Sequence, residues 1–164
     1  MTDFLGDPTQ FEFLVQRVLP ELIKTYGYGI RKKLVLWSVS CSNGEEPYSL
    51  AMALSEFSDR YPGFAFDFLI LATDAEPGAL QTAERAIYHE ESIHPVPLAW
   101  RKKYLLRSKD REKKRVKIAD ELRKLVKFRH IDFMKPKLEF REPIDVIFCR
   151  GLFDRLEKHL QEKL

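Results

Sequence analysis

The sequence has few cysteines and no long hydrophobic run, and each absence excludes a class of protein. Cys41 and Cys149 are the two cysteines among 164 residues, and no CxxC or Cys/His cluster accompanies them. We therefore expect two reduced thiols, with neither a disulfide framework nor a metal site. No apolar run approaches the ~18 residues needed to span a bilayer, and the acidic start "MTDFLGDPTQ" lacks a basic-then-apolar leader. These features predict a cytoplasmic protein without membrane insertion.

The net charge of +3 is small but unevenly distributed. Residues 101–117, "RKKYLLRSKDREKKRVK", hold ten Lys/Arg against two Asp/Glu, so this segment carries +8 and the rest of the chain −5. Such a run is usually a solvated surface loop, but it can also attract an acidic partner or nucleic acid. Tyr104 is its single aromatic residue. Because nucleic-acid surfaces commonly use several stacked aromatics, we do not expect a nucleic-acid partner.

The order of apolar segments predicts one α/β domain. Apolar residues repeat with a 3.6-residue period over residues 8–26, which predicts a leading helix. Short apolar runs predict buried strands at 34–39, 64–74, 126–133 and 144–150. Further helices are expected near 45–57 with Pro47 in the first turn, at 77–86, 97–105, 119–126 and 152–164, with a loop or hairpin at 107–118. Because strands and helices alternate, the sheet should be parallel with right-handed crossovers.

The stretch "SCSNGEEP" lies where the first strand should give way to a helix. In open parallel sheets, ligands bind beyond the carboxyl ends of the strands. Gly44 can adopt positive φ, and small neighbours let a ligand approach the backbone. Glu45 and Glu46 would repel a phosphate by a few kcal/mol at low effective dielectric, so a cationic or zwitterionic ligand fits better. The alternative is that both acids only complement the helix dipole. No GxGxxG motif is present, which weakens a dinucleotide interpretation.

The second strand ends in "LATDAEP". An acid at this place can accept hydrogen bonds from both hydroxyls of an adenosine ribose, and Asp74 is the candidate. The alternative interpretation is that Asp74 is the N-cap of the following helix, which is a common role for Asp.

Four segments resemble, in order and spacing, the catalytic domain of the CheR family of chemotaxis receptor glutamate methyltransferases. They are "WSVSCSNGEEPYSLAMAL", "LATDAEPGALQTAERAIY", "VKFRHIDFMKP" and "IDVIFCRGL". "TDFLGDPTQFEFL" is similar to the segment before the family's first strand, so the resemblance covers nearly all of residues 1–164. It implies a Rossmann-like, doubly wound parallel sheet of the S-adenosylmethionine methyltransferase type. Residues 1–33 would form the leading segment and helix, and residues 34–164 the cofactor-binding half, with a basic insertion at about 101–117.

The resemblance also implies a site for S-adenosylmethionine and its product S-adenosylhomocysteine. Glu46 would hold the α-amino group, Asp74 the ribose hydroxyls, and Asp132, where the family usually has Asn, the adenine amino group. Arg150 matches the arginine of the family's "FCRN" motif beside the methionine portion, and it is the residue we expect to take part in positioning for catalysis. The full expected cofactor-binding set is Thr2, Ser42, Gly44, Glu46, Asp74, Asp132, Phe133, Arg150 and Gly151.

The implied reaction transfers a methyl group from the sulfonium to a chemoreceptor glutamate carboxylate. That carboxylate has a pKa near ~4.3 and is ionised at pH 7, so no general base is needed. Three positions depart from the family near the chemistry: Gly6 replaces an arginine, Gly151 an asparagine and Arg155 a tyrosine. These departures favour retained cofactor binding, and they leave an alternative function open, a non-catalytic module that binds S-adenosylmethionine, S-adenosylhomocysteine or a protein partner.

The end of the sequence and the basic segment lead to two expectations about partners. The family continues through three more strands after the fourth, so we expect a sheet without those C-terminal strands, whose apolar fourth strand can pair with a second copy. Residues 101–117 fall where the family inserts a small antiparallel subdomain, which in some members docks the receptor's tail. The glycines of that subdomain's turn are missing here. We therefore do not predict recognition of the tail, and the expected partner is a chemoreceptor cytoplasmic domain or another acidic protein.

Overall fold

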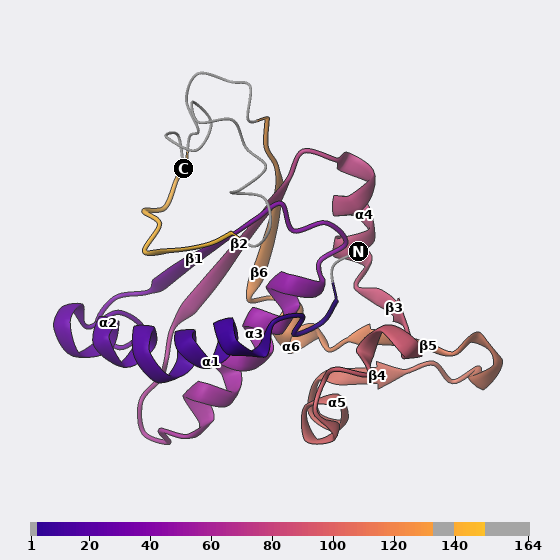
Figure 1. Ribbon diagram of the computed structural model, residues 1–164, viewed down its shortest axis with the longest axis horizontal. Coiled ribbons are helices and arrows are strands. Elements are labelled where there is room, and N and C mark those ends of the chain that lie inside the picture. The colour runs from indigo at the N-terminus through magenta and orange to yellow at the C-terminus, as the bar shows by residue number, and fades with distance from the viewer. Residues whose placement is uncertain (1–2, 133–139, 150–164) are drawn as a thin grey trace.

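The computed structural model describes residues 3–132 and 140–149, and its centre is a four-stranded parallel sheet (Figure 1). The strand order is β6-β2-β1-β7, and all three neighbouring pairs are parallel. In chain order this is the third, second, first and fourth strand, so the chain switches direction across the sheet between β1 and β7. This confirms the predicted Rossmann-like α/β fold. The strands are β1 Leu34–Val39, β2 Phe68–Asp74, β6 Val126–His130 and β7 Val146–Phe148.

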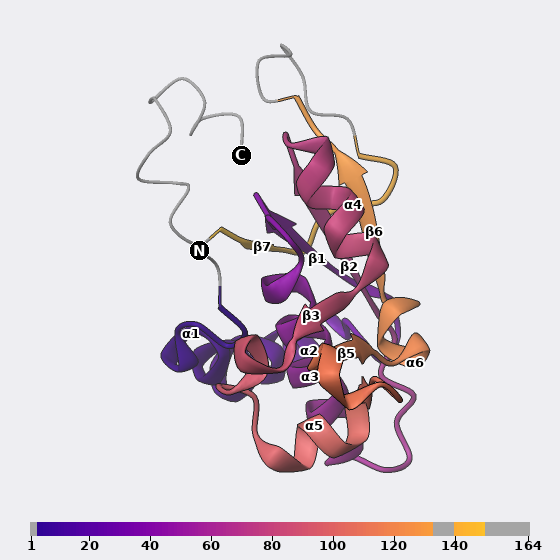
Figure 2. The same cartoon turned by 90° about the vertical axis from the view of Figure 1, so that its right-hand side faces the viewer.

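Helices precede and connect the strands, and a second, smaller sheet lies apart from the first (Figure 2). This small sheet is antiparallel in the order β3-β5-β4 and includes the predicted hairpin of residues 107–118. Its strands are β3 Ile87–His89, β4 Leu105–Arg107 and β5 Arg115–Ile118. The helices are α1 Pro8–Phe13, α2 Leu19–Tyr26, α3 Glu45–Asp59, α4 Pro77–Arg85, α5 Leu98–Tyr104 and α6 Asp120–Arg123, with short 3₁₀ turns at Glu90–Ile93 and Arg111–Lys113. The helix predicted at 152–164 lies outside the described residues.

The leading helix has the predicted limits but contains a wider turn that the sequence analysis did not predict. A π-helical segment, Leu14–Val18, lies between α1 and α2, and the amide of Leu19 donates to the carbonyl of Leu14. Pro20 follows at once. Because proline has no amide hydrogen and its ring clashes with the carbonyl four residues earlier, the preceding turn adopts the longer hydrogen-bond spacing.

The second strand begins later than predicted, at Phe68 rather than Phe64. Leu34, the first residue of β1, pairs with Phe68, so residues before Phe68 have no strand opposite them. Phe64 is 57% exposed, and the ring of Phe66 packs on Phe57 with centroids 5.4 Å apart. The aromatic run therefore leaves the sheet and lines an apolar hollow of about 310 Å³ instead of extending the strand.

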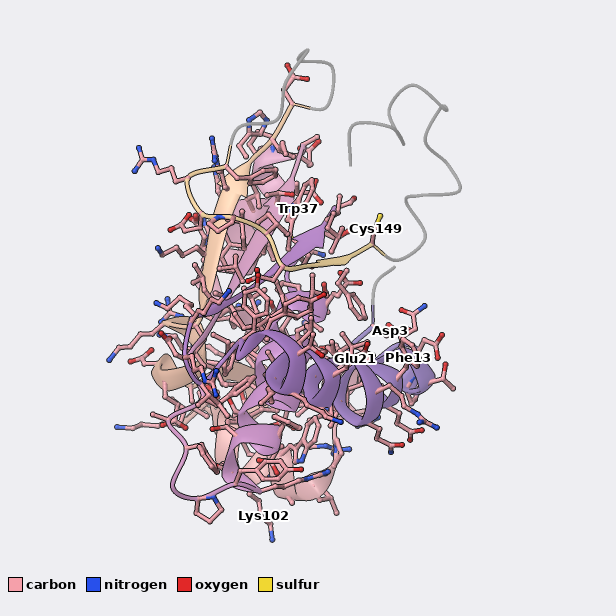
Figure 3. The ribbon with its side chains drawn as sticks, turned by 90° about the vertical axis from the view of Figure 1, so that its left-hand side faces the viewer. Asp3, Phe13, Glu21, Trp37, Lys102 and Cys149 are labelled. Carbon is pink, nitrogen blue, oxygen red and sulfur yellow. The ribbon has the colours of Figure 1, made fainter. Side chains whose placement is uncertain are left out.

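The main sheet buries apolar side chains on both faces. Leu34, Leu36 and Ile70 belong to the larger cluster, which α1 to α4 share. Trp37 and Leu71 point to the opposite face, where the Trp37 ring lies 4.6 Å from the ring of Phe140. Figure 3 shows Trp37 within this sheet and Cys149 beside the end of β7. Because both faces are covered, the edge that holds the strand ends is the part of the main sheet that positions a ligand.

Candidate functional site at the carboxyl ends of the strands

The loop after β1 has an unfavourable backbone conformation that its surroundings hold in place. Ser40, Ser42 and Gly44 have φ of 55°, 49° and 96°. Left-handed backbone costs a non-glycine residue about 1–2 kcal/mol, so such a loop persists only where tertiary contacts fix it. The amide of Cys41 donates to the carbonyl of Thr73 at 2.9 Å, which fastens the loop to β2. Strain of this kind is concentrated at binding sites, and here it lies at the place that the sequence predicted.

Asp74 ties the same loop to the end of β2. Its Oδ2 accepts the amide hydrogen of Ser42 at 2.8 Å, and its Oδ1 accepts that of Glu76 at 2.9 Å. The N-cap residue of α4 is Glu76, so the alternative role of Asp74 as that N-cap is wrong. Asp74 is 7% exposed. Since each carboxylate oxygen has more than one lone pair, the side chain can also accept hydrogen bonds from ligand hydroxyls.

The two glutamates of the first turn of α3 are both buried. Glu45 is 8% exposed and Glu46 is 4% exposed. Oε1 of Glu46 accepts a 2.7 Å hydrogen bond from the hydroxyl of Ser38, on β1. An acid that only complements a helix dipole does so from solvent, whereas Glu46 is drawn in against the strand. The sequence analysis missed Ser38, although a lone polar residue inside the run "LVLWSV" is a signal that could have indicated it.

The Cys41 thiol lies in this loop, where burial and nearby carboxylates raise its pKa. Burial raises this pKa most, and the nearby charges of Asp74 and then Glu46 raise it further. Cys41 is 1% exposed. The thiol therefore stays protonated at neutral pH and is not a nucleophile.

Gly44 and Tyr88 close the other side of the loop. A Cβ at Gly44 would lie 2.8 Å from the Cβ of Ala83 and 2.9 Å from the Tyr88 hydroxyl, so a side chain has no room there. The Tyr88 hydroxyl donates to the carbonyl of Asn43 at 2.7 Å. The sequence analysis missed Tyr88, because nothing in the local pattern indicates that β3 reaches this loop.

The end of β6 completes the site on the side of β2. The amide of Ile131 donates to the carbonyl of Asp74 at 3.0 Å, and Asp132 follows with an exposed side chain. A ring nitrogen of His130 lies 3.1 Å from the carbonyl oxygen of Ala75. The backbone next to Asp132 is therefore held against the end of β2 at Asp74.

The structure brings together five of the nine predicted cofactor-binding residues. They are Ser42, Gly44, Glu46, Asp74 and Asp132. Thr2, Phe133, Arg150 and Gly151 lie outside the described residues, as does Arg155. Gly6 is described, and its amide donates to the carbonyl of Asp3 at 3.2 Å in a turn before α1.

Chemically, this edge suits a ligand with a positive group and hydroxyls better than a phosphate. Glu46 and Asp74 place two buried carboxylates around one loop, and a phosphate would be repelled there.

In residues 3–132 and 140–149, no group of three or more His, Cys, Asp or Glu side chains has the arrangement of a metal site. The same part of the chain contains no helix with the length and hydrophobicity to cross a bilayer.

Comparison with known proteins points to one family. The family model described as "CheR methyltransferase, SAM binding domain" matches residues 1–164. A "Chemotaxis protein methyltransferase" from Borreliella burgdorferi is 33% identical over 99% of this chain and 56% of its own length. A "Probable chemotaxis protein methyltransferase" from Rhizobium etli is 31% identical over 99% of this chain and 59% of its own. "Chemotaxis protein methyltransferase 2" of Pseudomonas aeruginosa is 32% identical over 81% and 46%, so the chain spans about half the length of these curated relatives.

Proposed function

This chain belongs to the family of CheR methyltransferases, SAM-binding domain, and we propose that it binds S-adenosylmethionine and methylates glutamate side chains of chemoreceptors. The observation that carries the proposal is the burial of Glu46 and Asp74 around the strained loop after β1. The methionine portion of S-adenosylmethionine has an ammonium and a sulfonium group, which match buried carboxylates as a phosphate would not.

The described residues fit this cofactor in three places. Glu46 would hold the ammonium group, and Asp74 the two ribose hydroxyls. Gly44, where no Cβ can be accommodated, lets the loop between them pack closely on Ala83 and Tyr88. Asp132 would face the adenine amino group from the end of β6. The roles of Thr2, Phe133, Arg150 and Gly151 stay predictions.

The chemistry asks for positioning rather than proton transfer. S-adenosylmethionine, when bound, supplies a methyl group activated by the sulfonium. The receptor carboxylate that accepts it is ionised at pH 7, since its ordinary pKa is ~4.3. The residues of this chain would therefore align the two reactants and exclude water. Gly6 cannot supply the guanidinium that the family has at this position, so any positive charge near the carboxylate comes from elsewhere.

The small sheet, with the adjoining α5 and the β4–β5 connection, offers a surface for an acidic partner, which we propose to be the receptor's cytoplasmic domain. Lys102, Lys109, Lys114 and Arg115 are exposed, and no ion pair involves them within the described part of the chain. Their uncompensated charge would attract acidic segments and speed association. This proposal places the protein in the cytoplasm, where that receptor domain is found, and involves no nucleic acid.

Methyl transfer to isolated receptor fragments is the direct test. The protein is incubated with methyl-labelled S-adenosylmethionine and a chemoreceptor cytoplasmic fragment, and base-labile label on the fragment is counted. We expect label with the wild type and a strong loss in Asp74→Asn. Binding of S-adenosylhomocysteine without transfer would replace this proposal with the second candidate, a non-catalytic cofactor-binding module, which the replacement of arginine by Gly6 favours. No binding at all would exclude both.

We further propose that β7 mediates self-association. Within the described residues β7 pairs with β1 alone, and Ile147 is 43% exposed beside a hollow of about 570 Å³ that Phe13 also lines. An apolar strand edge can pair with the same edge of a second copy. Sedimentation equilibrium over a hundredfold concentration range should show a dimer that Ile147→Lys weakens. A monomer at every concentration would reject this proposal.

A further inference from the structure

We propose that Tyr88 is a positioning residue that holds the loop of residues 40–44 in its ligand-binding conformation. The inference rests on the proposed function, because the loop matters for activity only if it binds the cofactor. It goes beyond that proposal by assigning a role to a residue of the small sheet.

The Tyr88 ring is fixed in place on several sides. It is 7% exposed, and it packs edge-on against Phe4 with centroids 4.9 Å apart and planes at 86°. A second edge-on contact, with Tyr48, has a centroid distance of 6.4 Å. The hydroxyl is also 2.9 Å from where a Cβ of Gly44 would lie. These contacts hold the Tyr88 ring in the orientation that directs its hydroxyl toward the loop.

The loop needs contacts of this kind because its backbone does not favour the observed shape. Ser40 and Ser42 both have positive φ. The contacts that hold the loop from the main sheet come from Thr73 and Asp74, which bind the amides of Cys41 and Ser42. The Tyr88 hydroxyl binds the next carbonyl, that of Asn43, from the opposite side. The loop is thus fastened to the main sheet at its beginning and to the small sheet at its end.

The Tyr88 hydroxyl also stays a donor over the physiological pH range. Burial is the largest cause that raises the pKa of this phenol above its ordinary value, and the neighbouring Tyr48 and Glu45 raise it further. The O–H group is therefore intact at neutral pH and can donate to the Asn43 carbonyl.

The expected consequence of losing this bond is a weaker ligand rather than an unfolded protein. A ligand that binds one conformation of a loop loses apparent affinity in proportion to the fraction of molecules in that conformation. One neutral hydrogen bond gives a net factor of about three to ten in such an equilibrium. The dissociation constant for S-adenosylhomocysteine should therefore rise without the bond, by no more than about this factor, because only molecules whose loop leaves the binding conformation lose affinity.

Two tyrosines of this chain allow a matched comparison. Tyr88→Phe removes the hydroxyl and keeps the ring. Tyr48→Phe does the same at a neighbouring buried tyrosine, whose hydroxyl donates to the carbonyl of Ala83 at 3.0 Å and not to a residue of the loop. Calorimetry with S-adenosylhomocysteine and urea unfolding are measured for both. Similar losses of stability are expected, while affinity falls by up to about tenfold in Tyr88→Phe and by clearly less in Tyr48→Phe.

Amide hydrogen exchange of residues 40–44 in the free protein separates this inference from the proposed function. Exchange should be faster in Tyr88→Phe than in Tyr48→Phe. If the wild type binds no S-adenosylhomocysteine, the proposed function fails, and the exchange rates still test the role of Tyr88. Wild-type affinity and unchanged loop exchange in Tyr88→Phe would overturn the inference, and so would equal losses of affinity in both variants.

Discussion

The hydroxyl of Ser38 donates a 2.7 Å hydrogen bond to Oε1 of Glu46, which joins the first strand to the first turn of the helix that follows it. Both residues are buried, at 0% and 4% exposure. The loop of residues 40–44 lies between them in the sequence, so this bond fixes the separation of its two ends. The same carboxylate is the one we propose to hold the cofactor's ammonium group.

Ser38→Ala should therefore weaken both stability and ligand binding. A hydrogen bond to a charged group contributes about 1.5–3 kcal/mol, and its loss leaves a buried carboxylate with one donor fewer. We expect urea unfolding to show a loss in this range and calorimetry to show weaker binding of S-adenosylhomocysteine. Ser92→Ala is the control, since the Ser92 hydroxyl makes an exposed 2.7 Å bond to the carbonyl of His89. Equal effects of the two substitutions would contradict the role of Ser38.

Asp74→Asn should be more damaging than its small change in shape suggests. The carboxylate accepts the amide hydrogens of Ser42 and Glu76 on its two oxygens. Asparagine has one acceptor oxygen, so its NH₂ group must face one of these N–H donors, at a cost of about 1–3 kcal/mol in the free energy of unfolding. Binding of S-adenosylhomocysteine should be lost as well.

The control for Asp74 is Asp67→Asn, just before the start of the same strand. Asp67 forms an ion pair with Lys33 at 3.6 Å, and both side chains are at least half exposed. Such a pair contributes ~0–1 kcal/mol, so we expect little change in unfolding and none in ligand affinity. A loss of affinity in Asp67→Asn as large as in Asp74→Asn would show that the substitution acts through the strand and not through the site.

Alkaline pH should destabilise the protein through buried groups near the site. Burial raises the pKa of the Cys41 thiol and of the Tyr88 phenol, and it is the largest cause that raises the pKa of Tyr48 to about 12. A group whose folded pKa is raised contributes stability that is complete below its unfolded pKa and is lost as pH rises toward the folded pKa. The unfolded values are ~8.5 for Cys and ~10 for Tyr. The free energy of unfolding should thus begin to fall above pH ~8.5 and fall faster above pH ~10.

Urea unfolding between pH 7 and pH 11 measures this decline. Cys41→Ala should remove the part that begins near pH ~8.5 and leave the part that begins near pH ~10. A decline with the same onset in Cys41→Ala and in the wild type would show that the thiol does not contribute.

In labelling with iodoacetamide at pH 8, we expect the half-buried Cys149 to react well before Cys41.

The α/β fold could be predicted because each main-sheet strand follows from local composition. The run Leu34–Val39 is apolar throughout and has the predicted limits as β1. Phe64 shows where local composition fails, because a strand begins only where a partner strand begins, and that partner is set by the fold. Pro20 was visible in the sequence, but its effect, the wider turn at Leu14–Val18, depends on the helix continuing through it.

The candidate site was predicted in part, for similar reasons. Glu46 and Asp74 follow strand ends, so their meeting at one edge follows from a parallel sheet. The spacing did not reveal their burial, nor that Asp74 binds the backbone of Ser42. Tyr88 was missed because its bond to Asn43 joins residues 45 positions apart, one on a strand of the small sheet and the other in the loop after β1.

The basic face of the small sheet should bind its partner with a marked dependence on salt. Arg115 and Lys117 lie on β5 and have no ion pair in the described part of the chain. Charges at the rim of an interface act mainly on the association rate and its screening by salt. Affinity for a chemoreceptor cytoplasmic fragment should therefore fall between 50 and 300 mM NaCl, at ionic strengths where the Debye length shortens from about 14 to 6 Å.

The double variant Arg115→Glu/Lys117→Glu tests whether this face carries the effect. We expect slower association and a smaller salt dependence than in the wild type, with unchanged binding of S-adenosylhomocysteine. The double variant Arg17→Glu/Lys24→Glu, at two exposed cations of the leading helix without an ion pair in the residues described, is the matched change of charge elsewhere. If Arg17→Glu/Lys24→Glu slows association as much as Arg115→Glu/Lys117→Glu does, net charge rather than the small sheet governs the encounter.

Gly44→Ala should be among the most damaging single substitutions at the site. Comparison with Gly63→Ala separates the contribution of backbone strain from that of overpacking. Gly44 and Gly63 both have positive φ, 96° and 115°. A Cβ at Gly44 would lie 2.8 Å from the Cβ of Ala83, whereas nothing lies within 4 Å of a Cβ at Gly63. Gly63→Ala therefore measures backbone strain alone, about 1–2 kcal/mol of unfolding free energy. Gly44→Ala adds overpacking of about 1–3 kcal/mol and displaces the loop, so S-adenosylhomocysteine binding should be lost in that variant alone. Equal destabilisation by the two substitutions would mean that Ala83 and Tyr88 yield to the new methyl group, and the loop would then be less tightly held than its contacts imply.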